Sequence, residues 1–446
     1  MPKPKNLKRV AFVSTRIAGT DGVSLEIEKW ARVLEERLGF ECCYIAGECD
    51  RPVEKSAVIP EMHFTHPEIE CISHCAFVEE RRDRQLTEDI ARMTRHLRDQ
   101  INEAIHALEA DALILENAVT IPMNVPLGVA LVQEIQELPI GVLAHHHDFR
   151  WERERFLVNS IDDILRYAFP PALAHIQHVV INSLAGEEFC RRTGQSCRII
   201  PNVMDFENPP PAPDDYARRF RAEIGLSEDD LLILQPTRVV QRKGIEHAVE
   251  LVRRLEMPNA KLVITHSATD EGSAYAERIV EFAKLLGVEL IFTDKQIGEH
   301  RGETPDGRPV FTIADAYSQA DLVTYPSEYE GFGNAFLEAL YHRKPVVCNR
   351  YAIYRTDIEP CGFEVVLFDG FITPETIEHT RRVLLDHDYR DQMAEHNYQI
   401  GKEFFSFSNL EEDLRSIIGH PQNIYRMLGR MVRGPSCPHR LAAFEE

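Results

Sequence analysis

Pro326-Ser-Glu-Tyr-Glu-Gly-Phe-Gly-Asn-Ala-Phe-Leu-Glu338 is the stretch that decides the fold of this chain. The apolar run 321–325 precedes it and a helical pattern of apolar residues follows it, so it is predicted to connect a buried strand to a helix. Gly331 and Gly333 allow the backbone to approach a ligand closely. A helix that begins near Asn334 would point unpaired N–H groups and its positive dipole end toward the same place. The stretch therefore suits a phosphate-bearing ligand, although glycines alone are equally compatible with an ordinary connection.

Two carboxylates bracket this connection. Glu330 is expected in the loop and Glu338 about one turn into the helix, where they could reach different hydroxyl groups of one extended ligand. Two surface glutamates are the alternative interpretation.

The size and charge of the chain limit its class. At 446 residues it is too long for one ordinary core, so two α/β domains are expected. The formal net charge of -22 argues against a nucleic-acid-binding protein, because phosphate backbones need clustered Lys and Arg. The ten cysteines show no paired CxxC spacing, and no apolar run has the length of a signal or transmembrane segment. We therefore expect a reduced, cytoplasmic protein that is not integral to a membrane.

Apolar runs that alternate with amphipathic stretches predict two Rossmann-like domains of the α/β class. The first is expected over residues 1–205 and the second over 214–410, with a proline-rich linker at 206–213. Residues 411–446 are expected to form a helical segment that packs back toward the first domain. The predicted strands are 10–14, 42–46, 112–116, 140–144, 178–182 and 198–200 in the first domain, and 231–235, 261–265, 289–292, 322–325, 345–348 and 364–368 in the second.

The first predicted strand leads into Thr15-Arg-Ile-Ala-Gly-Thr-Asp-Gly-Val-Ser-Leu-Glu26. Gly19 and Gly22 make this loop pliable, and Ser24 is expected to cap the helix that follows. The loop lacks the G-x-G-x-x-G pattern, so it does not indicate a dinucleotide site.

Cations gather after the first strand of the second domain, in Gln235-Pro-Thr-Arg-Val-Val-Gln-Arg-Lys-Gly244. Arg238 and Lys243 would suit a diphosphate at the carboxyl end of the sheet. Arg242 is interpreted as a solvated neighbour.

Three adjacent histidines close a strand of the first domain, in Leu143-Ala-His-His-His-Asp-Phe-Arg-Trp-Glu-Arg153. Neighbours on a strand point to opposite faces, so the run converges poorly on one ion and no metal site is predicted. A polar site is preferred, in which His146 or His147 bonds a ligand hydroxyl and Arg150 or Arg153 meets an anion.

Together these motifs resemble the retaining family-4 glycosyltransferases of the GT-B fold. The resemblance implies two Rossmann-like domains facing each other across a cleft, and transfer of a hexose from a nucleotide-diphosphate sugar with retention at the anomeric carbon. The matching positions are Arg238 and Lys243 in R-x4-K-G, Pro326-Ser327, Glu330 and Glu338 in E-x7-E, Pro345-Val-Val347, Ile200-Pro-Asn-Val-Met-Asp205 and His147-Asp148.

The resemblance also implies roles for individual residues. The catalytic set is His147, Arg238, Lys243 and Glu330, and the donor-binding set is Gly22, Ser327, Gly331, Phe332, Gly333, Asn334 and Glu338. The donor is expected to be a UDP- or GDP-linked hexose. No cofactor is expected to be required, and a divalent cation is not implied by any protein site.

The acceptor is expected to be a small polar molecule, and an acidic one in our hypothesis. The loop Glu116-Asn-Ala-Val-Thr-Ile-Pro-Met-Asn124 and the run 146–153 resemble the mannosylglucosylglycerate-type synthases of this family. The predicted acceptor-binding residues are Ser24, Asn117, Asn124, His146, Asp148, Arg150 and Arg153. A sugar-nucleotide 2-epimerase of the same fold and a non-catalytic nucleotide-sugar-binding protein are the alternatives, and a homo-oligomer is left open.

Overall fold

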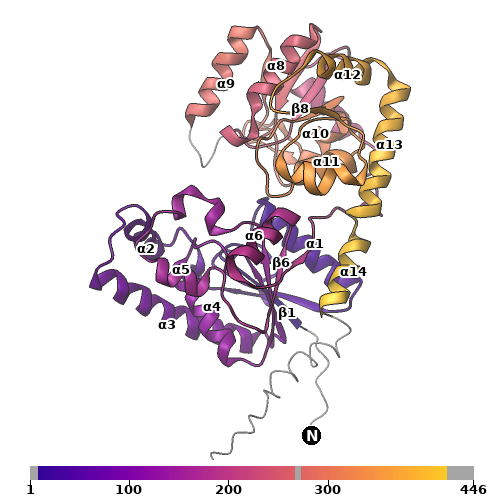
Figure 1. Ribbon diagram of the computed structural model, residues 1–446. Helices are drawn as coiled ribbons and strands as arrows, with labels where there is room; N and C mark the ends of the chain where they lie inside the picture. The colour runs from indigo at the N-terminus through magenta and orange to yellow at the C-terminus, as the bar shows by residue number, and fades with distance from the viewer. Residues whose placement is uncertain (1–8, 267–272, 419–446) are drawn as a thin grey trace, which may run out of the picture. The chain divides into compact units, whose positions relative to one another are not determined.

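The computed structural model describes residues 9–266 and 273–418, which form two compact units (Figure 1). Among the described residues, the first unit contains 9–180, 185–199 and 411–418, and the second contains 181–184, 200–266 and 273–410. The predicted helical segment 411–446 falls partly on helix α14 (Phe407–Ile418), and its portion beyond residue 418 lies outside the described residues.

The sheet of the first unit has seven parallel strands in the order β3-β2-β1-β4-β5-β6-β7. The six strands predicted in this domain are confirmed. The very short β3 was not predicted. The strands are β1 (Arg9–Ser14), β2 (Glu41–Ala46), β3 (Ser56–Val58), β4 (Ala112–Glu116), β5 (Gly141–His146), β6 (Ile176–Val180) and β7 (Arg198–Ile199).

Helices cover this sheet. Helices α2 to α5 bury one face, where Val13, Ile45 and Leu115 pack against apolar side chains of those helices. Trp30 of α1 is completely buried and stacks on His145 of β5. The helices are α1 (Gly22–Glu36), α2 (Pro67–Phe77), α3 (Arg84–Ala107), α4 (Val125–Glu137), α5 (Asp162–Ala168) and α6 (Ser183–Thr193).

Helix α1 begins in a different way from the prediction. Asp21 is its N-cap, and the Asp21 carboxylate accepts hydrogen bonds from the backbone N–H groups of Val23 and Ser24. The Ser24 hydroxyl instead donates to the Asp21 carboxylate at 2.7 Å, and the carbonyl of Ala18 lies 3.2 Å from it as an alternative acceptor. A carboxylate at this position satisfies the free N–H groups and also complements the positive end of the helix dipole.

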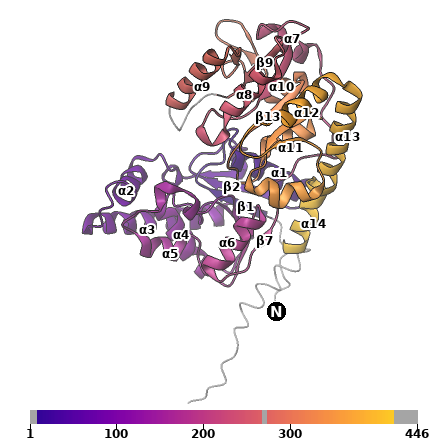
Figure 2. The same cartoon turned by 45° about the horizontal axis from the view of Figure 1, so that its top comes forward.

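The sheet of the second unit has six parallel strands in the order β10-β9-β8-β13-β14-β15, with helices on both sides (Figure 2). Successive residues of β8 alternate between two apolar clusters: Leu232 and Leu234 face α10 and α11, and Ile233 faces α8, α9 and α12. All six predicted strands are confirmed. The strands are β8 (Leu231–Gln235), β9 (Ala260–Ile264), β10 (Leu290–Phe292), β13 (Leu322–Tyr325), β14 (Val346–Asn349) and β15 (Val366–Phe368).

The remaining elements of the second unit are seven helices and a separate antiparallel pair of very short strands. They are α7 (Asp215–Glu223), α8 (Ile245–Leu255), α9 (Ser273–Leu286), α10 (Ile313–Gln319), α11 (Asn334–Tyr341), α12 (Pro374–Leu385) and α13 (His387–Phe404), with β11 (Gly302–Glu303) and β12 (Pro309–Val310). The proline-rich residues 206–213 form no helix or strand, and Phe206 is completely buried against Tyr398.

Each sheet reverses its strand order at one point, between β1 and β4 in the first unit and between β8 and β13 in the second. In open parallel sheets, ligands bind outside the carboxyl ends of the strands at this point. Each unit therefore has a defined place for a ligand.

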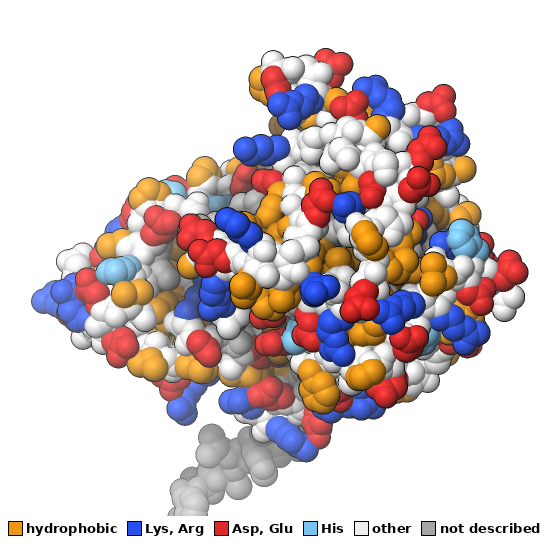
Figure 3. All heavy atoms as spheres, turned by 90° about the horizontal axis from the view of Figure 1, so that it is seen from above, with side chains coloured by type: hydrophobic (Ala, Val, Ile, Leu, Met, Phe, Trp, Pro, Cys, Tyr) orange, Lys and Arg blue, Asp and Glu red, His pale blue; other side chains and the backbone are white. Residues whose placement is uncertain are grey.

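On the face shown in Figure 3, Lys and Arg side chains are interspersed with Asp and Glu, so its described part has no continuous basic patch for a phosphate backbone. Within residues 9–266 and 273–418, no helix combines the length and the apolar character needed to cross a bilayer.

Candidate functional site

The loops after β8 and β13 meet at the switch point of the second sheet. Gly244 has a left-handed φ of 56°, and a Cβ built on it would lie 2.6 Å from the carbonyl oxygen of Pro326. The backbone N–H of Glu328 donates to the carbonyl of Arg242 at 2.9 Å. The two motifs that the sequence singled out are thus held together by their backbones.

Lys243 and Glu330 form a buried ion pair between these loops. Arg242 is not the solvated neighbour that the sequence predicted, because its Nη1 lies 3.2 Å from Oε2 of Glu330. Burial lowers the pKa of Lys243, and Glu330 acts in the opposite direction. Burial alone would raise the pKa of Glu330, but Lys243 and Arg242 outweigh it and lower the pKa. The carboxylate is therefore held in its charged form.

Arg238 lies in the same electrostatic environment. Burial lowers the pKa of His266, and the charges of Arg238 and Lys243 lower it further, so both cations act on one place. Three cationic side chains, those of Arg238, Arg242 and Lys243, therefore gather at this loop, as a site for an anionic ligand such as a diphosphate requires.

The segment after Glu330 is fixed by its neighbours. Asn182 donates to the carbonyl of Gly331 at 2.7 Å, and the hydroxyl of Tyr351 donates to that of Phe332 at 2.8 Å. Gly333 has a φ of 136° and precedes α11, which begins at Asn334.

The polar side chains around α11 also have partners. Oδ1 of Asn334 accepts a hydrogen bond from Asn202 at 2.6 Å, and Oε2 of Glu338 accepts one from the hydroxyl of Tyr317 at 3.1 Å. Ser327 is completely buried, and its carbonyl accepts a hydrogen bond from Asn349. The predicted donor-binding residues 327–338 are therefore brought together with Lys243, whereas Gly22 lies in the first unit, where it begins α1.

Replacing Gly244 by alanine is expected to destabilise the second unit by about 2 kcal/mol, because it combines left-handed backbone strain with a clash against the Pro326 carbonyl. Calorimetric unfolding measures the effect. Gly287→Ala is the matched control, since Gly287 has a similar φ of 68° with nothing within 4 Å of its Cβ position. Equal losses in the two variants would contradict the close approach of the loops.

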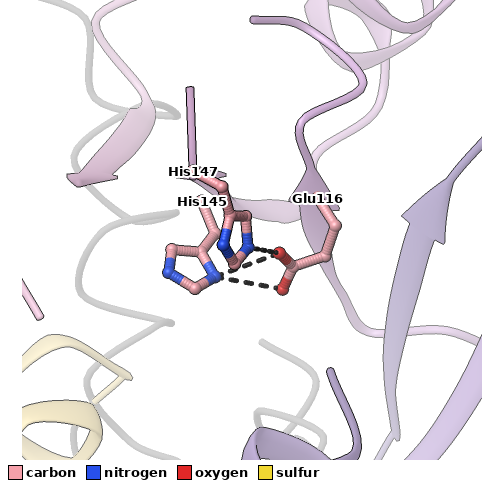
Figure 4. A group of neighbouring side chains, drawn as sticks. All are labelled: Glu116, His145 and His147. Carbon is pink, nitrogen blue, oxygen red and sulfur yellow. Dashed lines mark hydrogen bonds and ion pairs between the residues drawn. The ribbon is translucent and has the colours of Figure 1, made fainter. Parts of the chain in front are cut away.

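Glu116, His145 and His147 meet at the carboxyl ends of β4 and β5 (Figure 4). The Glu116 carboxylate lies 3.0 Å from Nδ1 of His145 and 2.9 Å from Nε2 of His147. An ionised carboxylate only accepts hydrogen bonds, so these ring nitrogens carry the protons. His145 and His147 are two residues apart on an extended segment and share a face, which the sequence argument about adjacent histidines did not consider.

The Glu116 carboxylate and the two imidazoles change one another's pKa values. Burial would raise the pKa of Glu116, but the two imidazoles outweigh it and lower the pKa to about 2. Burial lowers the pKa of His145, whereas for His147 the hydrogen bond and charge of Glu116 outweigh burial and raise the pKa. A buried carboxylate thus faces a His147 that favours its protonated form.

The same three side chains offer ligand atoms that all lie within 4.8 Å of one another, so they could hold a metal ion. However, the 2.9 and 3.0 Å separations are hydrogen-bond lengths. Ligand atoms at about 2.0–2.1 Å from a tetrahedral zinc ion would lie about 3.3 Å or more apart. The observed geometry fits a hydrogen-bonded group better.

His146 belongs to a second, separate pair. Its Nε2 lies 2.8 Å from Nδ1 of His178 of β6, its Nδ1 contacts the hydroxyl of Thr120, and both imidazoles pack against the ring of Phe189. Burial lowers the pKa of His146 well below its usual value and that of His178 to about 4. His146 is therefore a neutral, internally bonded side chain.

Acidification is expected to destabilise the first unit between about pH 6.5 and pH 4. In this window the unfolded chain protonates His146 and His178 while the folded chain does not, so stability falls as the pH falls. In this window His178→Asn should reduce the slope of the free energy of unfolding against pH by about 1.4 kcal/mol per pH unit. Urea unfolding followed by tryptophan fluorescence measures it, since Trp30 and Trp151 are the only tryptophans and both lie in this unit.

The control for this measurement is His106→Asn on the exposed side of α3, which is expected to leave the slope unchanged. An unchanged slope in His178→Asn would show that the histidine pair does not govern acid stability.

The other predicted acceptor-binding residues are largely engaged within the protein. Asn124 caps α4 and donates to the carbonyls of Glu61 and Met62. Nε of Arg150 donates to the carbonyl of Phe169, and Arg153 pairs with Asp148 at 2.7 Å. These contacts hold Asn124, Arg150 and Arg153 in place within the protein. Asn117 has a left-handed φ of 56°, and its Oδ1 accepts the backbone N–H of His147.

Sequence reasoning missed two residues at the carboxyl edge of the first sheet. Glu116 was treated as the end of a strand, and Arg16 as part of a loop. Arg16 directly follows Thr15 after β1, and with Asn117 after β4 it lines a cavity at the switch point. That position in the chain is the signal that could have identified it.

Comparison with known proteins agrees with this architecture. The family described as Glycosyl transferases group 1 matches residues 232–395. Mannosylglucosylglycerate synthase of Petrotoga mobilis is 33% identical over 380 residues, covering 80% of this chain and 86% of that protein. The synthase of the same name from Thermotoga maritima is 29% identical over 439 residues, covering 91% of this chain and 98% of that protein.

Among solved structures, HepE of Anabaena in complex with UDP-glucose superposes with a TM-score of 0.62 at 13% identity, covering 95% of this chain and 99% of that chain. The likeness shows a shared GT-B fold of two parallel-sheet domains. With the identity and coverage of the Petrotoga protein, it leads to one conclusion: the chain belongs to the group 1 glycosyl transferases.

Proposed function

We propose that this enzyme transfers a hexose, with retention at the anomeric carbon, from a nucleotide-diphosphate sugar to a small acidic acceptor of the glucosylglycerate class. The observation that carries the proposal is the cationic loop of Arg238 and Lys243, joined to the loop of Glu330 at the switch point of the second sheet. The two relatives are named as synthases of mannosylglucosylglycerate, and the proposed acceptor class is chosen to agree with that name.

The charges of the second unit suit the departure of a nucleotide diphosphate. Negative charge accumulates on the leaving diphosphate in the transition state, and fixed cations stabilise it without reorganisation. Arg238 and Lys243 supply those cations, and the N-terminus of α11 adds backbone N–H groups. Positive charge is thus available from the chain itself, so a divalent cation is not required.

Retention follows if the departing phosphate takes the proton of the acceptor hydroxyl on the same face of the sugar. Glu330 is then a binding and orienting residue, because its carboxylate is committed to Lys243 and Arg242. A covalent glycosyl adduct on Glu330, detected by mass spectrometry with a slow donor, would instead assign it as a nucleophile.

The proposal is tested by incubating the full chain with GDP-mannose or UDP-glucose and glucosylglycerate, and by following the anomeric proton of the product by NMR. A product with the donor's α configuration is expected. A β-linked product would overturn retention, and no product from any nucleotide sugar would overturn the transfer. Deuterium that enters the donor from heavy water without acceptor would identify an epimerase, and donor binding without slow hydrolysis would identify a binding protein.

A further inference from the structure

The carboxyl end of β1 opens on a cavity of about 110 Å³. It lies at the switch point of the first sheet, between the loops that follow β1 and β4. Its lining includes Thr15, Arg16, Asp21, Phe64 and Asn117. A cavity of this size has space for a polar group of a ligand.

Arg16 is the cation of this cavity, and much of its hydrogen-bonding capacity is unused. A guanidinium has five N–H donors. Nη2 of Arg16 lies 3.2 Å from the Asp21 carboxylate, and the guanidinium carbon lies 5.6 Å from the ring centre of Phe64. Nε is buried, and within the described residues no acceptor lies in hydrogen-bond reach of it. The side chain as a whole keeps 36% of its surface exposed, so other donors of the guanidinium are accessible to a ligand in the cavity.

Asp21 does not neutralise Arg16 completely, because its carboxylate has other donors to satisfy. It accepts hydrogen bonds from the backbone N–H groups of Val23 and Ser24 at 3.0 and 3.2 Å, and from the Ser24 hydroxyl at 2.7 Å. Asp21 also lies at the positive end of the 15-residue helix α1. The cavity therefore favours an anion beside Arg16.

We propose that Arg16 binds the carboxylate of the acceptor in this cavity and so selects acidic acceptors. The inference rests on the proposed function, since it identifies the residue that would recognise the acid. One guanidinium matches one carboxylate in a bidentate arrangement. A phosphate dianion would favour a second cation, and among the described residues that line the cavity Arg16 is the only Lys or Arg. The more obvious candidates, Arg150 and Arg153, already bind the Phe169 carbonyl and Asp148.

The test compares Arg16→Ala and Arg16→Lys with the unmodified full chain at saturating donor. The acceptors are glucosylglycerate and glucosylglycerol, which lacks the carboxylate. Arg16→Ala is expected to raise the KM for glucosylglycerate about 10- to 100-fold, while kcat/KM for glucosylglycerol changes less than about 3-fold. Arg16→Lys should fall between, because it keeps the charge and loses the bidentate geometry.

Arg51→Ala is the matched control, since Arg51 also contacts the start of α1, through the carbonyl of Ser24, and does not line the cavity. It is expected to leave both KM values within about 2-fold. Equal losses with both acceptors, or an equal KM rise in Arg51→Ala, would overturn the assignment of Arg16.

Two further measurements separate this inference from the proposed function. Slow hydrolysis of the nucleotide sugar is expected to be unchanged in Arg16→Ala. If the unmodified chain shows no such hydrolysis, sugar transfer itself would be refuted. Calorimetric titration of glucosylglycerate detects the Arg16 contact without turnover, and equal affinity in the unmodified chain and Arg16→Ala would overturn the contact. A phosphorylated sugar that binds as tightly and depends equally on Arg16 would overturn the choice of a carboxylate.

Discussion

Replacing Lys243 by alanine is expected to reduce kcat/KM for sugar transfer by about 10³-fold. Lys243 is buried at the switch point of the second sheet, so no water-exposed cation can take its place beside a diphosphate. The same variant leaves Glu330 in a buried site with Arg242 as its remaining cationic partner among the described contacts. Breaking a buried ion pair in this way costs about 3 kcal/mol of stability. Initial rates and calorimetric unfolding measure the two effects.

A double variant separates the two losses. Lys243→Ala with Glu330→Gln removes the uncompensated charge, so part of the stability should return while the transfer rate stays low. Lys261→Ala is the control for removing a lysine from this unit, since Lys261 of β9 pairs with Glu289 at the edge of the sheet. If the double variant regains activity together with stability, Lys243 has a structural role and does not bind the diphosphate.

The fold was predictable because each strand is marked by a short run of neighbouring apolar residues in the sequence. Each buried parallel strand is a short apolar run, and runs such as 231–235 and 322–325 reappear as β8 and β13 with their predicted bounds. Strand β3 has only three residues, and none of them is buried, so it left no apolar signal. The cap of α1 was assigned to Ser24 in place of Asp21, since both residue types are good caps and only the backbone path decides between them.

The site of the first unit was less predictable because it depends on the register between strands. Glu116 of β4 is paired with His145 of β5, and this pairing brings the carboxylate beside both imidazoles. Nothing in the sequence fixes which residues of two parallel strands lie opposite each other. The sequence also could not show that Arg242 turns toward Glu330, because a charged side chain in a loop can face either solvent or a partner.

The second large effect is expected from Glu116→Gln, which keeps the size of the side chain and removes its charge. The pKa of Glu116 is about 2 in the folded chain and about 4.5 when unfolded, so the carboxylate contributes about 3 kcal/mol of stability above pH 4.5. That contribution is lost as the pH falls toward 2. The variant should therefore be less stable at neutral pH, and the part of the difference that comes from the Glu116 charge should shrink as the pH falls below about 4.5.

The same substitution is expected to lower kcat about 10²-fold with little change in either KM, because Glu116 orients His147 and raises its pKa without touching substrate. Glu134→Gln provides the comparison, since Glu134 is equally buried and pairs with Arg98 on a helix of the same unit. It should lose stability and keep kcat. Equal kcat losses in both variants would reduce Glu116 to a general structural role.

Loss of kcat in the unmodified enzyme on treatment with a chelator, with recovery on adding zinc, would instead show that Glu116, His145 and His147 hold a metal ion. The short hydrogen-bond distances among them lead us to expect that chelation has no effect.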